Sequence, residues 1–411
     1  MSNSKNTSNS KRLLMLCWEY PPRIIGGLAR VVGALASELA NLNFEVHVVT
    51  ADHPGTKENE NHGNLFIHRV KTQTDTTPDF VSWVNRLNFG LLQYALAIHR
   101  HKPFDLIHAH DWMVADSAWV LKSGLGIPIV TTIHATESGR MHGIHNDLQR
   151  YIHQVEWRLT YESWRIIVNS QAMKQELNGL FSTPLDKIDV IPNGTYPKAF
   201  AINFDKNEMR NKLARPHEKI VLYVGRMVRE KGAHVLLEAA SKIIPQLPGT
   251  RLLMVGTGYY LDELKSMAYH YGISDNVSFL GYVDDDELKK IYKIADTVVI
   301  PSLYEPFGIV ALEGMAANVP VVCSDVGGLL DFVEHRQTGI TTYAGDANSL
   351  AWGILQVLRD ADLRNYIVKT ANLKVNKIYN WEVIAKQTAN VYNQVLSESK
   401  KMGVDKIALE I

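Results

Sequence analysis

The stretch that decides the fold is IVLYVGRMVREKG, residues 220–232, in which a continuous apolar run ends at a glycine and passes into a charged turn. An apolar run of this length is typical of a buried strand, and the charged turn precedes a helical pattern. Similar runs alternate with amphipathic stretches along most of the chain, which predicts parallel, doubly wound α/β sheets. The other expected strands are 13–17, 46–50, 65–70, 106–109, 127–133, 166–169, 188–191, 252–255, 277–280, 298–300 and 319–323.

Two domains of similar size are expected, because the alternation restarts after a polar stretch at residues 197–218. The expected parts are a disordered tail at 1–12, a first domain at 13–205, a second domain at 206–375 and a helix at 376–411 that returns to the first domain. Residues 344–399 show helical patterns only, and we place four apolar residues on one helix face: Trp352, Ile354, Val357 and Leu358. The two domains are expected to face a cleft, with the C-terminal helices packing back across both.

Composition excludes several classes of protein. Lysine plus arginine number 43 and aspartate plus glutamate number 43, so no net charge draws the chain to nucleic acid or to an anionic membrane. Cys17 and Cys323 lie far apart in apolar runs and are expected to be buried thiols in a reducing compartment. The apolar-leaning stretch at 80–101 is interrupted by polar residues and cannot span a membrane. We therefore expect a cytoplasmic protein.

Two glycines, Gly26 and Gly27, follow the first strand in EYPPRIIGG and open the next helix. Glycines at such a turn let backbone N–H groups approach a phosphate, and the helix N-terminus favours negative charge. An ordinary tight loop is the alternative interpretation, because two glycines are a weak signal.

Two cations, Arg226 and Lys231, stand five residues apart between the strand at 220–224 and the following helix. The guanidinium fork and the mobile ammonium group together suit a diphosphate leaving group. A solvated charged turn is the alternative, and we assign Arg229 and Glu230 to it.

Two glutamates, Glu305 and Glu313, stand eight residues apart in SLYEPFGIVALEGMAA. Pro306 favours a helix start, so Glu305 is expected in the loop and Glu313 on the helix. One carboxylate can accept hydroxyls from a sugar and the other from a ribose. The open first turn is expected to hold phosphate oxygens through the amides of Phe307, Gly308 and Ile309.

Polar residues also follow two strands of the first domain. Asp111, preceded by His108 and His110, ends the motif HAHD, and His134 follows the strand before ATESGR. The position at a strand end raises Asp111 and His134 above ordinary structural residues. A metal site is disfavoured, because no cysteine or third ligand stands at a recognisable spacing.

Together these motifs resemble the retaining, nucleotide-sugar-dependent glycosyltransferases of the GT-B fold, which has two Rossmann-like domains. The family includes bacterial glycogen synthases, sucrose-phosphate synthases and phosphatidylinositol mannosyltransferases. The most specific part is GR-x4-KG followed by E-P-F-G-x4-E, and the resemblance covers about residues 12–395. It implies that the first domain binds the acceptor and the second binds the nucleotide sugar.

The resemblance assigns roles to single residues of the second domain. Arg226 and Lys231 resemble the diphosphate clamp, Glu305 the group that holds the hydroxyls of the transferred sugar, and Glu313 the ribose-binding acid. In the first domain, Gly27 resembles the glycine that meets the donor phosphates, and His134 the residue near C6 and the anomeric centre.

The neighbourhoods of HAHDW and HATESGR look closest to the α-glucan-forming branch. They imply transfer of glucose from ADP- or UDP-glucose to a glycan, without a metal cofactor and without a nucleic-acid partner. Two departures bear on this. The family commonly has an acidic residue two positions after the IPNG segment, where this chain has Tyr196 followed by Pro197. Arg23 stands near the glycines where glycogen synthases have a lysine.

Other functions stay open at this point. A glycosyltransferase with a lipid or cell-envelope acceptor at the membrane surface would need a basic, apolar face, for which residues 80–102 are the candidate. A sugar-nucleotide epimerase would share the architecture but use no acceptor, and a non-catalytic binder would hold the donor without turnover. The donor base, the acceptor, the linkage and the oligomeric state are not determined by the sequence.

Overall fold

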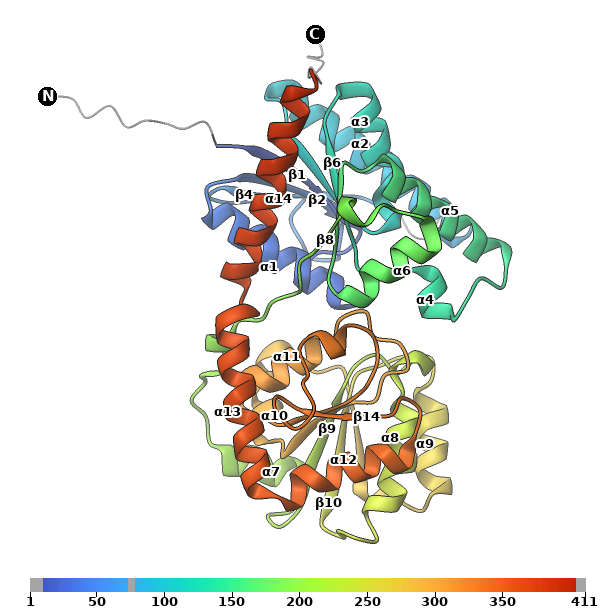
Figure 1. Ribbon diagram of the computed structural model, residues 1–411, viewed down its shortest axis with the longest axis vertical. Coiled ribbons are helices and arrows are strands. Elements are labelled where there is room, and N and C mark those ends of the chain that lie inside the picture. The colour runs from blue at the N-terminus through green and yellow to red at the C-terminus, as the bar shows by residue number, and fades with distance from the viewer. Residues whose placement is uncertain (1–9, 73–77, 404–411) are drawn as a thin grey trace, which may run out of the picture. The chain divides into compact units, whose positions relative to one another are not determined.

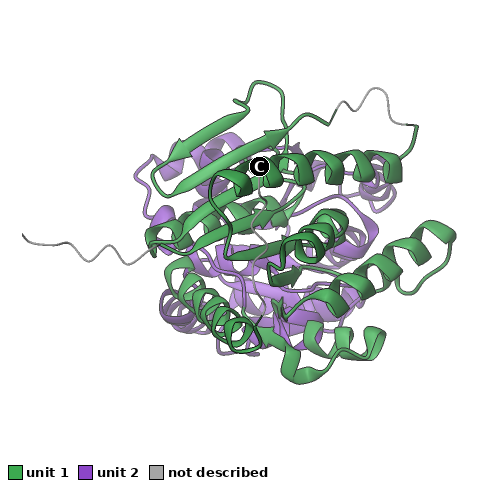
Figure 2. Cartoon of the chain, turned by 90° about the horizontal axis from the view of Figure 1, so that it is seen from above, with its two compact units in different colours: residues 1–169, 173–191, 381–411 green, residues 170–172, 192–380 purple. Residues whose placement is uncertain are grey.

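The computed structural model describes residues 10–72 and 78–403, which divide into two compact units (Figures 1 and 2). Unit 1 takes in the described residues up to 169, residues 173–191 and those from 381 onward; unit 2 consists of residues 170–172 and 192–380. Each unit contains one sheet of mostly parallel strands with crossover helices between them. The predicted fold class, two doubly wound α/β domains, is confirmed.

Unit 1 has, in the described residues, a sheet of eight strands in the order β3-β4-β2-β1-β5-β6-β7-β8. The strands are β1 (Arg12–Leu16), β2 (Glu45–Ala51), β3 (Asn59–His62), β4 (Leu65–Val70), β5 (Leu106–His110), β6 (Ile129–Ile133), β7 (Arg165–Val168) and β8 (Ile188–Val190). The helices are α1 (Gly27–Asn41), α2 (Phe80–His101), α3 (Ala115–Leu125), α4 (Glu137–Met141), α5 (Asp147–Glu162), α6 (Gln171–Phe181) and α14 (Trp381–Lys401). Because β1 lies between β2 and β5, the loops after these strands leave the sheet side by side.

The sequence did not predict β3, which pairs antiparallel with β4 at the edge of the sheet. Its residues, NENH, are polar and mostly exposed, so no apolar pattern marks the strand. Edge strands are often short and polar because such an edge resists pairing with another chain.

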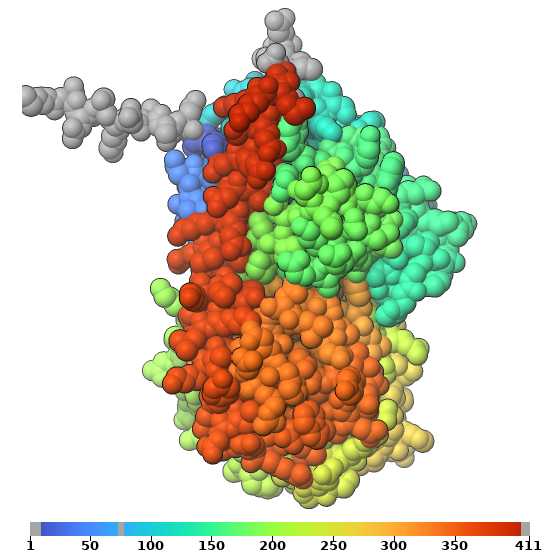
Figure 3. All heavy atoms as spheres, in the orientation of Figure 1, coloured from blue at the N-terminus to red at the C-terminus, as the bar shows by residue number. Residues whose placement is uncertain are grey.

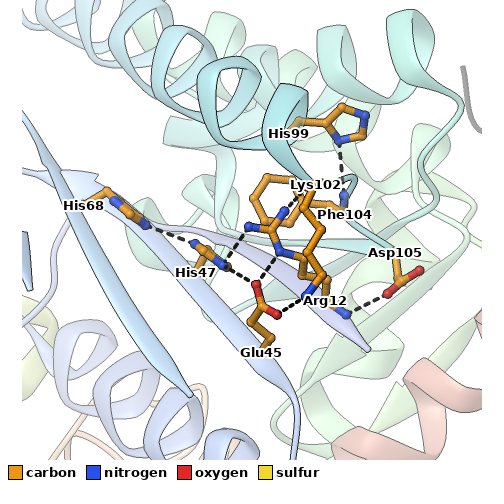
Figure 4. A network of polar contacts seen from close by, with 8 residues as sticks. All are labelled: Arg12, Glu45, His47, His68, His99, Lys102, Phe104 and Asp105. Carbon is orange, nitrogen blue, oxygen red and sulfur yellow. Dashed lines mark hydrogen bonds and ion pairs between the residues drawn. The ribbon is translucent and has the colours of Figure 1, made fainter. Parts of the chain in front are cut away.

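The predicted tail at 1–12 was wrong at its end, since Arg12 is the first residue of β1. Figure 4 shows why a charged residue fits there: the Arg12 side chain pairs with Glu45 on β2, and its backbone N–H donates to Asp105 at 2.6 Å. Residues 1–9 of the predicted tail lie outside the described residues.

Unit 2 has a six-stranded sheet within the described part of the chain, in the order β11-β10-β9-β12-β13-β14. The strands are β9 (Lys219–Val224), β10 (Thr250–Val255), β11 (Val277–Gly281), β12 (Thr297–Ile300), β13 (Val321–Ser324) and β14 (Ile340–Thr342). The helices are α7 (Lys206–Leu213), α8 (Ala233–Ile243), α9 (Leu261–His270), α10 (Asp285–Ile294), α11 (Ile309–Ala316), α12 (Ala347–Arg359) and α13 (Ala361–Ile378). The short strand β14 was not predicted, because its three residues are too few to make a pattern.

The chain passes from unit 1 to unit 2 after residue 191 and back after residue 380, whereas the sequence placed these changes at 205 and 375. Phe200 accounts for the first difference, because it is buried in the core of unit 2 with its ring 5.8 Å from that of Tyr292. Val375 and Tyr379 are buried in the same core, which keeps the end of α13 in unit 2.

The last helix, α14, packs on unit 1 beside α1, as Figure 1 shows. Its Tyr392 is fully buried, and the hydroxyl lies 2.6 Å from His108 Nδ1 on β5. The expected return of the chain to the first domain is therefore present as α14.

Trp352 on α12 corrects an expectation, because it is 44% exposed while Ile354, Val357 and Leu358 are buried. At 3.6 residues per turn, residue 352 lies about 200° from residue 354 around the helix, so these two positions belong to opposite faces. Ile354, Val357 and Leu358 therefore lie on the buried side of α12, and Trp352 does not.

Both cysteines are buried and free, as predicted. Burial raises the pKa of the Cys17 thiol to about 12, so it stays protonated.

None of the helices within residues 10–72 and 78–403 has the length and apolar character that crossing a membrane requires.

Candidate active site

The centre of the candidate site in unit 2 is an ion pair between Lys231 and Glu305. Lys231 follows β9 and Glu305 follows β12, and these strands are neighbours in the sheet. Lys231 Nζ lies 2.9 Å from Glu305 Oε2, and the buried hydroxyl of Ser302 donates to the same oxygen at 2.9 Å. Both contacts use Oε2, so in the described part of the chain Glu305 Oε1 keeps its capacity to accept a hydroxyl.

Arg226 lies in the same loop as Lys231, and its side chain is 47% exposed. Its guanidinium lies 3.4 Å from Glu230 Oε1, and its backbone carbonyl accepts a hydrogen bond from the buried Tyr223 hydroxyl at 2.9 Å. Assigning Glu230 to a solvated turn was wrong: its carboxylate is 18% exposed, and its backbone carbonyl accepts from Leu303 N at 2.8 Å. Glu230 therefore ties the Arg226–Lys231 loop to the loop that contains Glu305.

Glycines bring these loops within backbone contact. Gly232 has φ +68°, and a Cβ there would lie 1.8 Å from the carbonyl oxygen of Pro301. Gly327, after β13, has φ +52°, and a Cβ there would lie 2.1 Å from the carbonyl oxygen of Glu305. Only glycine fits at either position, because a side chain would displace the neighbouring backbone. The polar groups at the strand ends are thus held by backbone packing.

The helix that follows Glu305 starts later than predicted. α11 begins at Ile309 with Gly308 as its N-cap, because Gly308 adopts φ +104° and cannot belong to the helix. Phe307 lies before the helix with its side chain buried, 5.1 Å from the ring of Phe332. Of the three predicted first-turn amides, only that of Ile309 is helical. No side chain of the described residues caps this helix end, so it can accept an anion.

Glu313 lies on α11, as predicted, and is partly buried. Its Oε2 accepts a hydrogen bond from the Tyr292 hydroxyl on α10 at 2.7 Å. This bond fixes the direction of the carboxylate.

In unit 1, the loop with the two glycines is held by Glu19, which sequence reasoning missed. Glu19 is 1% exposed, and its Oε2 accepts hydrogen bonds from Ile25 N at 2.6 Å and Gly26 N at 3.1 Å. Burial raises the pKa of Glu19, although these bonds act against the rise. The Gly26 amide predicted for a phosphate is therefore engaged by Glu19, and Gly27 is the first residue of α1. The available signal was an acid three residues after β1, in the segment that leads to the glycine pair.

Asp111 and His134 come together at adjacent strand ends, as predicted. His134 N donates to Asp111 Oδ1 at 2.7 Å, and Asp111 has φ +61°, a conformation that non-glycine residues rarely adopt. Burial raises the pKa of Asp111 and lowers that of His134. Such strain at a partly buried carboxylate is typical of functional sites.

His108 and His110 lie inside β5, not after it, and both are fully buried. His110 Nδ1 lies 3.1 Å from His134 Nε2, and His108 is held between Thr132 and Tyr392. Burial lowers the pKa of His108 to about 3 and that of His110 well below its usual value, so both rings are neutral. His108 has a structural role, whereas His110 supports His134.

Glu156 on α5 is a second residue that sequence reasoning did not single out. It is 1% exposed, its Oε1 accepts from Glu137 N at 2.8 Å, and its Oε2 is buried without a partner. Burial raises its pKa to about 8, so the group is protonated near neutral pH. Glu156 thereby holds the start of α4, a few residues after His134.

Within the described residues, no three His, Cys, Asp or Glu side chains lie close enough to hold a metal ion.

Comparison with known proteins decides the family. Residues 205–374 match the family described as glycosyl transferases group 1, and residues 25–198 match glycosyltransferase family 4. An uncharacterised glycosyltransferase of Methanocaldococcus jannaschii is 41% identical over 385 residues, covering 93% of this chain and 97% of that protein. The chain belongs to the group 1 glycosyltransferases. Another relative in this family, the glycogen synthase of Mycobacterium tuberculosis, is 34% identical over 398 residues, with 93% and 94% coverage.

Solved structures share the GT-B architecture of this glycosyltransferase. Sucrose-phosphate synthase from Thermosynechococcus elongatus aligns with a TM-score of 0.82 at 26% identity, covering 94% of this chain and 100% of that one. The Anabaena HepE protein in complex with UDP-glucose aligns with a TM-score of 0.78 at 22% identity, covering 93% and 99%. The family and fold predicted from the motifs are confirmed.

Proposed function

We propose that this group 1 glycosyltransferase is a retaining hexosyltransferase that moves glucose from a nucleoside-diphosphate glucose to an α-glucan. The observation that carries the proposal is the Lys231–Glu305 pair with Arg226 in the same loop as Lys231. The 34% identity to a glycogen synthase supports an α-glucan acceptor, and the UDP-glucose bound to HepE supports a nucleoside-diphosphate glucose as donor.

In the proposed reaction, the bond between C1 of glucose and the β-phosphate oxygen breaks while a bond from the acceptor hydroxyl oxygen to C1 forms on the same face. The acceptor proton passes to that phosphate oxygen, and the nucleoside diphosphate departs. Arg226 and Lys231 neutralise the charge that develops on the diphosphate, and Glu305 holds sugar hydroxyls. Preorganised charge of this kind is worth about 3 to 4 kcal/mol per donor in well-studied enzymes.

The remaining residues take the roles implied by the family resemblance. Glu313 binds the ribose, Gly27 offers its amide to the donor phosphates, and His134 lies near C6 and the anomeric centre of the sugar. Beyond the resemblance, the amide of Ile309 holds a phosphate oxygen and Asp111 acts beside His134. The strained backbone of Asp111 and its bond to His134 N support this role. The arginine–lysine clamp replaces a divalent metal ion in the proposal, so EDTA should leave activity unchanged. Loss of activity in EDTA with recovery in manganese would contradict it.

We also propose a cytoplasmic location, where nucleotide sugars and reducing conditions occur together. The two buried free thiols, Cys17 and Cys323, support it. The accessible measurement is fractionation of cells that produce the full chain.

The experiment that tests the function is a matrix of donors and acceptors. ADP-, UDP- and GDP-glucose are each incubated with glycogen, maltotetraose and a polyprenyl phosphate, and labelled glucose in the product is counted. The anomeric configuration is read by NMR. The proposal predicts α-linked product from glycogen and maltotetraose with one preferred base, and β-linked product would contradict retention.

A second candidate is transfer to a lipid acceptor at a membrane surface. Phe80 and Phe89 on α2 are 46% and 63% exposed, and Phe89 lines the same cavity as the exposed Arg86, which favours it. However, Trp83 and Leu91, which the membrane-facing interpretation needs at the surface, are buried in the core of unit 1. Product from the polyprenyl phosphate alone would support this candidate. Donor turnover without any acceptor would instead indicate an epimerase.

A further inference from the structure

An exposed tryptophan on α12 marks a part of unit 2 that the proposed reaction does not use. Trp352 is 44% exposed and points away from the core that the rest of α12 covers. Its ring stacks against that of His335, with centroids 6.1 Å apart and planes at 10°. α12 lies on the face of unit 2 that Figures 1 and 3 turn toward the viewer.

Trp352 borders a cavity of about 610 Å³ at the β14 edge of the sheet. This volume lies within the roughly 300–1,000 Å³ of small-ligand sites. A second aromatic ring in the lining belongs to Tyr343, directly after β14, and it is 71% exposed. The cavity therefore offers two open aromatic rings, and none of its lining residues belongs to the Lys231–Glu305 group.

The polar lining is fixed by the backbone and still has free acceptors. Asp325 Oδ1 accepts from Ala344 N at 2.9 Å, and Asp346 Oδ1 accepts from Asn348 N at 2.8 Å and Ser349 N at 3.1 Å. These contacts hold both carboxylates in place. Among the described residues no partner engages Oδ2 of either, so each can accept a ligand hydroxyl.

Charge decides which class of ligand fits. The carboxylates of Asp325 and Asp346 line the cavity, and no lysine or arginine is among its described lining residues. A nearby ammonium, that of Lys242, pairs with Glu238 and donates to Asn348 Oδ1. A nucleotide, a phosphate or an acidic peptide would be repelled here. A neutral ligand with an apolar face for the rings and many hydroxyl donors for the carboxylates has the matching chemistry, and a glucan chain is such a ligand.

We propose that the cavity lined by Tyr343, Trp352, Asp325 and Asp346 is a second glycan-binding site, which holds a polymeric α-glucan acceptor away from the reacting end. The inference rests on the proposed α-glucan acceptor. A chain held there has its free ends at raised local concentration, which lowers the KM for a polymer but not for an oligosaccharide too short to reach.

The test separates binding from transfer. Full-length protein is run on native gels with and without glycogen, and KM is measured for glycogen, for maltotetraose and for the donor. We expect Trp352→Ala and Tyr343→Ala to weaken retardation by glycogen and to raise the KM for glycogen by about fivefold or more. The KM values for maltotetraose and donor should stay within about twofold.

Matched variants guard against a folding effect. Trp352→Phe keeps an aromatic ring and should retain most of the retardation, and Tyr269→Ala removes an 82% exposed tyrosine of α9 and should change nothing. Wild-type protein that glycogen does not retard, or variants with wild-type retardation and KM, would overturn the proposal. Equal losses with glycogen and maltotetraose would also overturn it. If wild-type protein is retarded but transfers glucose to neither acceptor, the cavity proposal stands and the proposed function fails.

Discussion

Lys231 Nζ lies 2.9 Å from Glu305 Oε2, although the two residues are 74 positions apart in the chain. The pair exists because β9 and β12 are neighbours, so the loops after them leave the sheet side by side. The two side chains are 22% and 13% exposed, which makes the pair accessible to a ligand yet partly shielded from water. A diphosphate entering beside Lys231 would share the ammonium with Glu305, and this sharing is the basis of the first two predictions.

Replacing either cation should slow the reaction without unfolding the protein. Arg226→Ala or Lys231→Ala is expected to lower kcat by roughly a hundredfold or more, because each removes a group that stabilises the departing diphosphate. The control is Arg229→Ala in the same loop, whose side chain is exposed, and it should retain near wild-type activity. Steady-state kinetics and thermal midpoints check this. Wild-type turnover in Lys231→Ala would remove the clamp from the mechanism.

Glu305→Gln keeps the shape of the side chain but removes its charge. We expect a lower kcat, by about tenfold or more, because the amide cannot orient Lys231 or accept sugar hydroxyls as strongly. Binding of free nucleoside diphosphate should weaken little, since Glu305 is assigned to the sugar. Calorimetric titration with the diphosphate separates the two effects. A loss of diphosphate affinity as large as that in Lys231→Ala would contradict the assignment.

Gly232→Ala should destabilise unit 2 strongly. The new Cβ would lie 1.8 Å from the carbonyl oxygen of Pro301. We expect a loss of about 4 kcal/mol or more in the free energy of unfolding. The matched control is Gly272→Ala, which has a similar φ of +67° but open space around the Cβ, so its cost is the left-handed backbone alone. That cost is about 1 to 2 kcal/mol. Equal losses in chemical denaturation would show that packing against Pro301 is unimportant.

Glu19→Ala should loosen the loop before α1. The change leaves the amides of Ile25 and Gly26 without their acceptor, at a cost of about 1 to 3 kcal/mol. Hydrogen exchange followed by mass spectrometry should show faster exchange in the peptide that contains residues 25 and 26. Glu19→Gln retains an acceptor oxygen and should exchange more slowly than Glu19→Ala. Exchange rates that do not distinguish Glu19→Ala from wild type would be evidence against this role.

Stability should fall as the pH drops below the usual histidine range. In the network of Figure 4, burial lowers the pKa of His47 to about 4, and the same cause gives His68 a pKa of about 4. Their ordinary value is 6.5, so between pH 6.5 and pH 4 the unfolded chain binds more protons than the folded one. The contribution of these two histidines to the free energy of unfolding therefore decreases as pH falls through this window and is fully retained above it.

His47→Gln tests that assignment, because glutamine cannot take up a proton. The loss of unfolding free energy between about pH 7.5 and pH 5 should be smaller by about 1 to 2 kcal/mol in this variant. The exposed His101, replaced by glutamine, is the control and should leave the loss unchanged. Denaturant titrations at the two pH values provide the comparison. A wild-type pH dependence in His47→Gln would assign the acid sensitivity to other groups.

Much of the fold could be predicted because buried parallel strands are continuous apolar runs. Two strands lack this pattern and were not predicted: β3 is polar because it lies at an edge, and β14 has only three residues. The unit boundary was placed late because the burial of Phe200 against Tyr292 depends on the folded core. Helix geometry alone would have placed Trp352 on the face opposite Ile354, but we expected both residues on one face.

From the sequence, the residues of the candidate site could be named only where they follow a strand. Arg226, Lys231 and Glu305 were named because they follow strands. The contact between Lys231 and Glu305 depends on which strands are neighbours, and no local sequence pattern gives the strand order. α11 starts late because Gly308 adopts a positive φ. This was not predicted, because we took Pro306 as the sign of the helix start. Glu19 was missed because a single acid between a strand and a glycine pair is only a weak signal of a side chain that binds backbone amides.

The central claim is that Arg226 and Lys231 hold the diphosphate of a nucleotide sugar. The most direct measurement is a crystal structure of the full chain soaked with the donor that the matrix selects. The account predicts a β-phosphate oxygen within hydrogen-bond distance of Lys231 Nζ and the Arg226 guanidinium, with hexose hydroxyls at Glu305. A donor bound elsewhere, with Lys231 still paired only to Glu305, would contradict it.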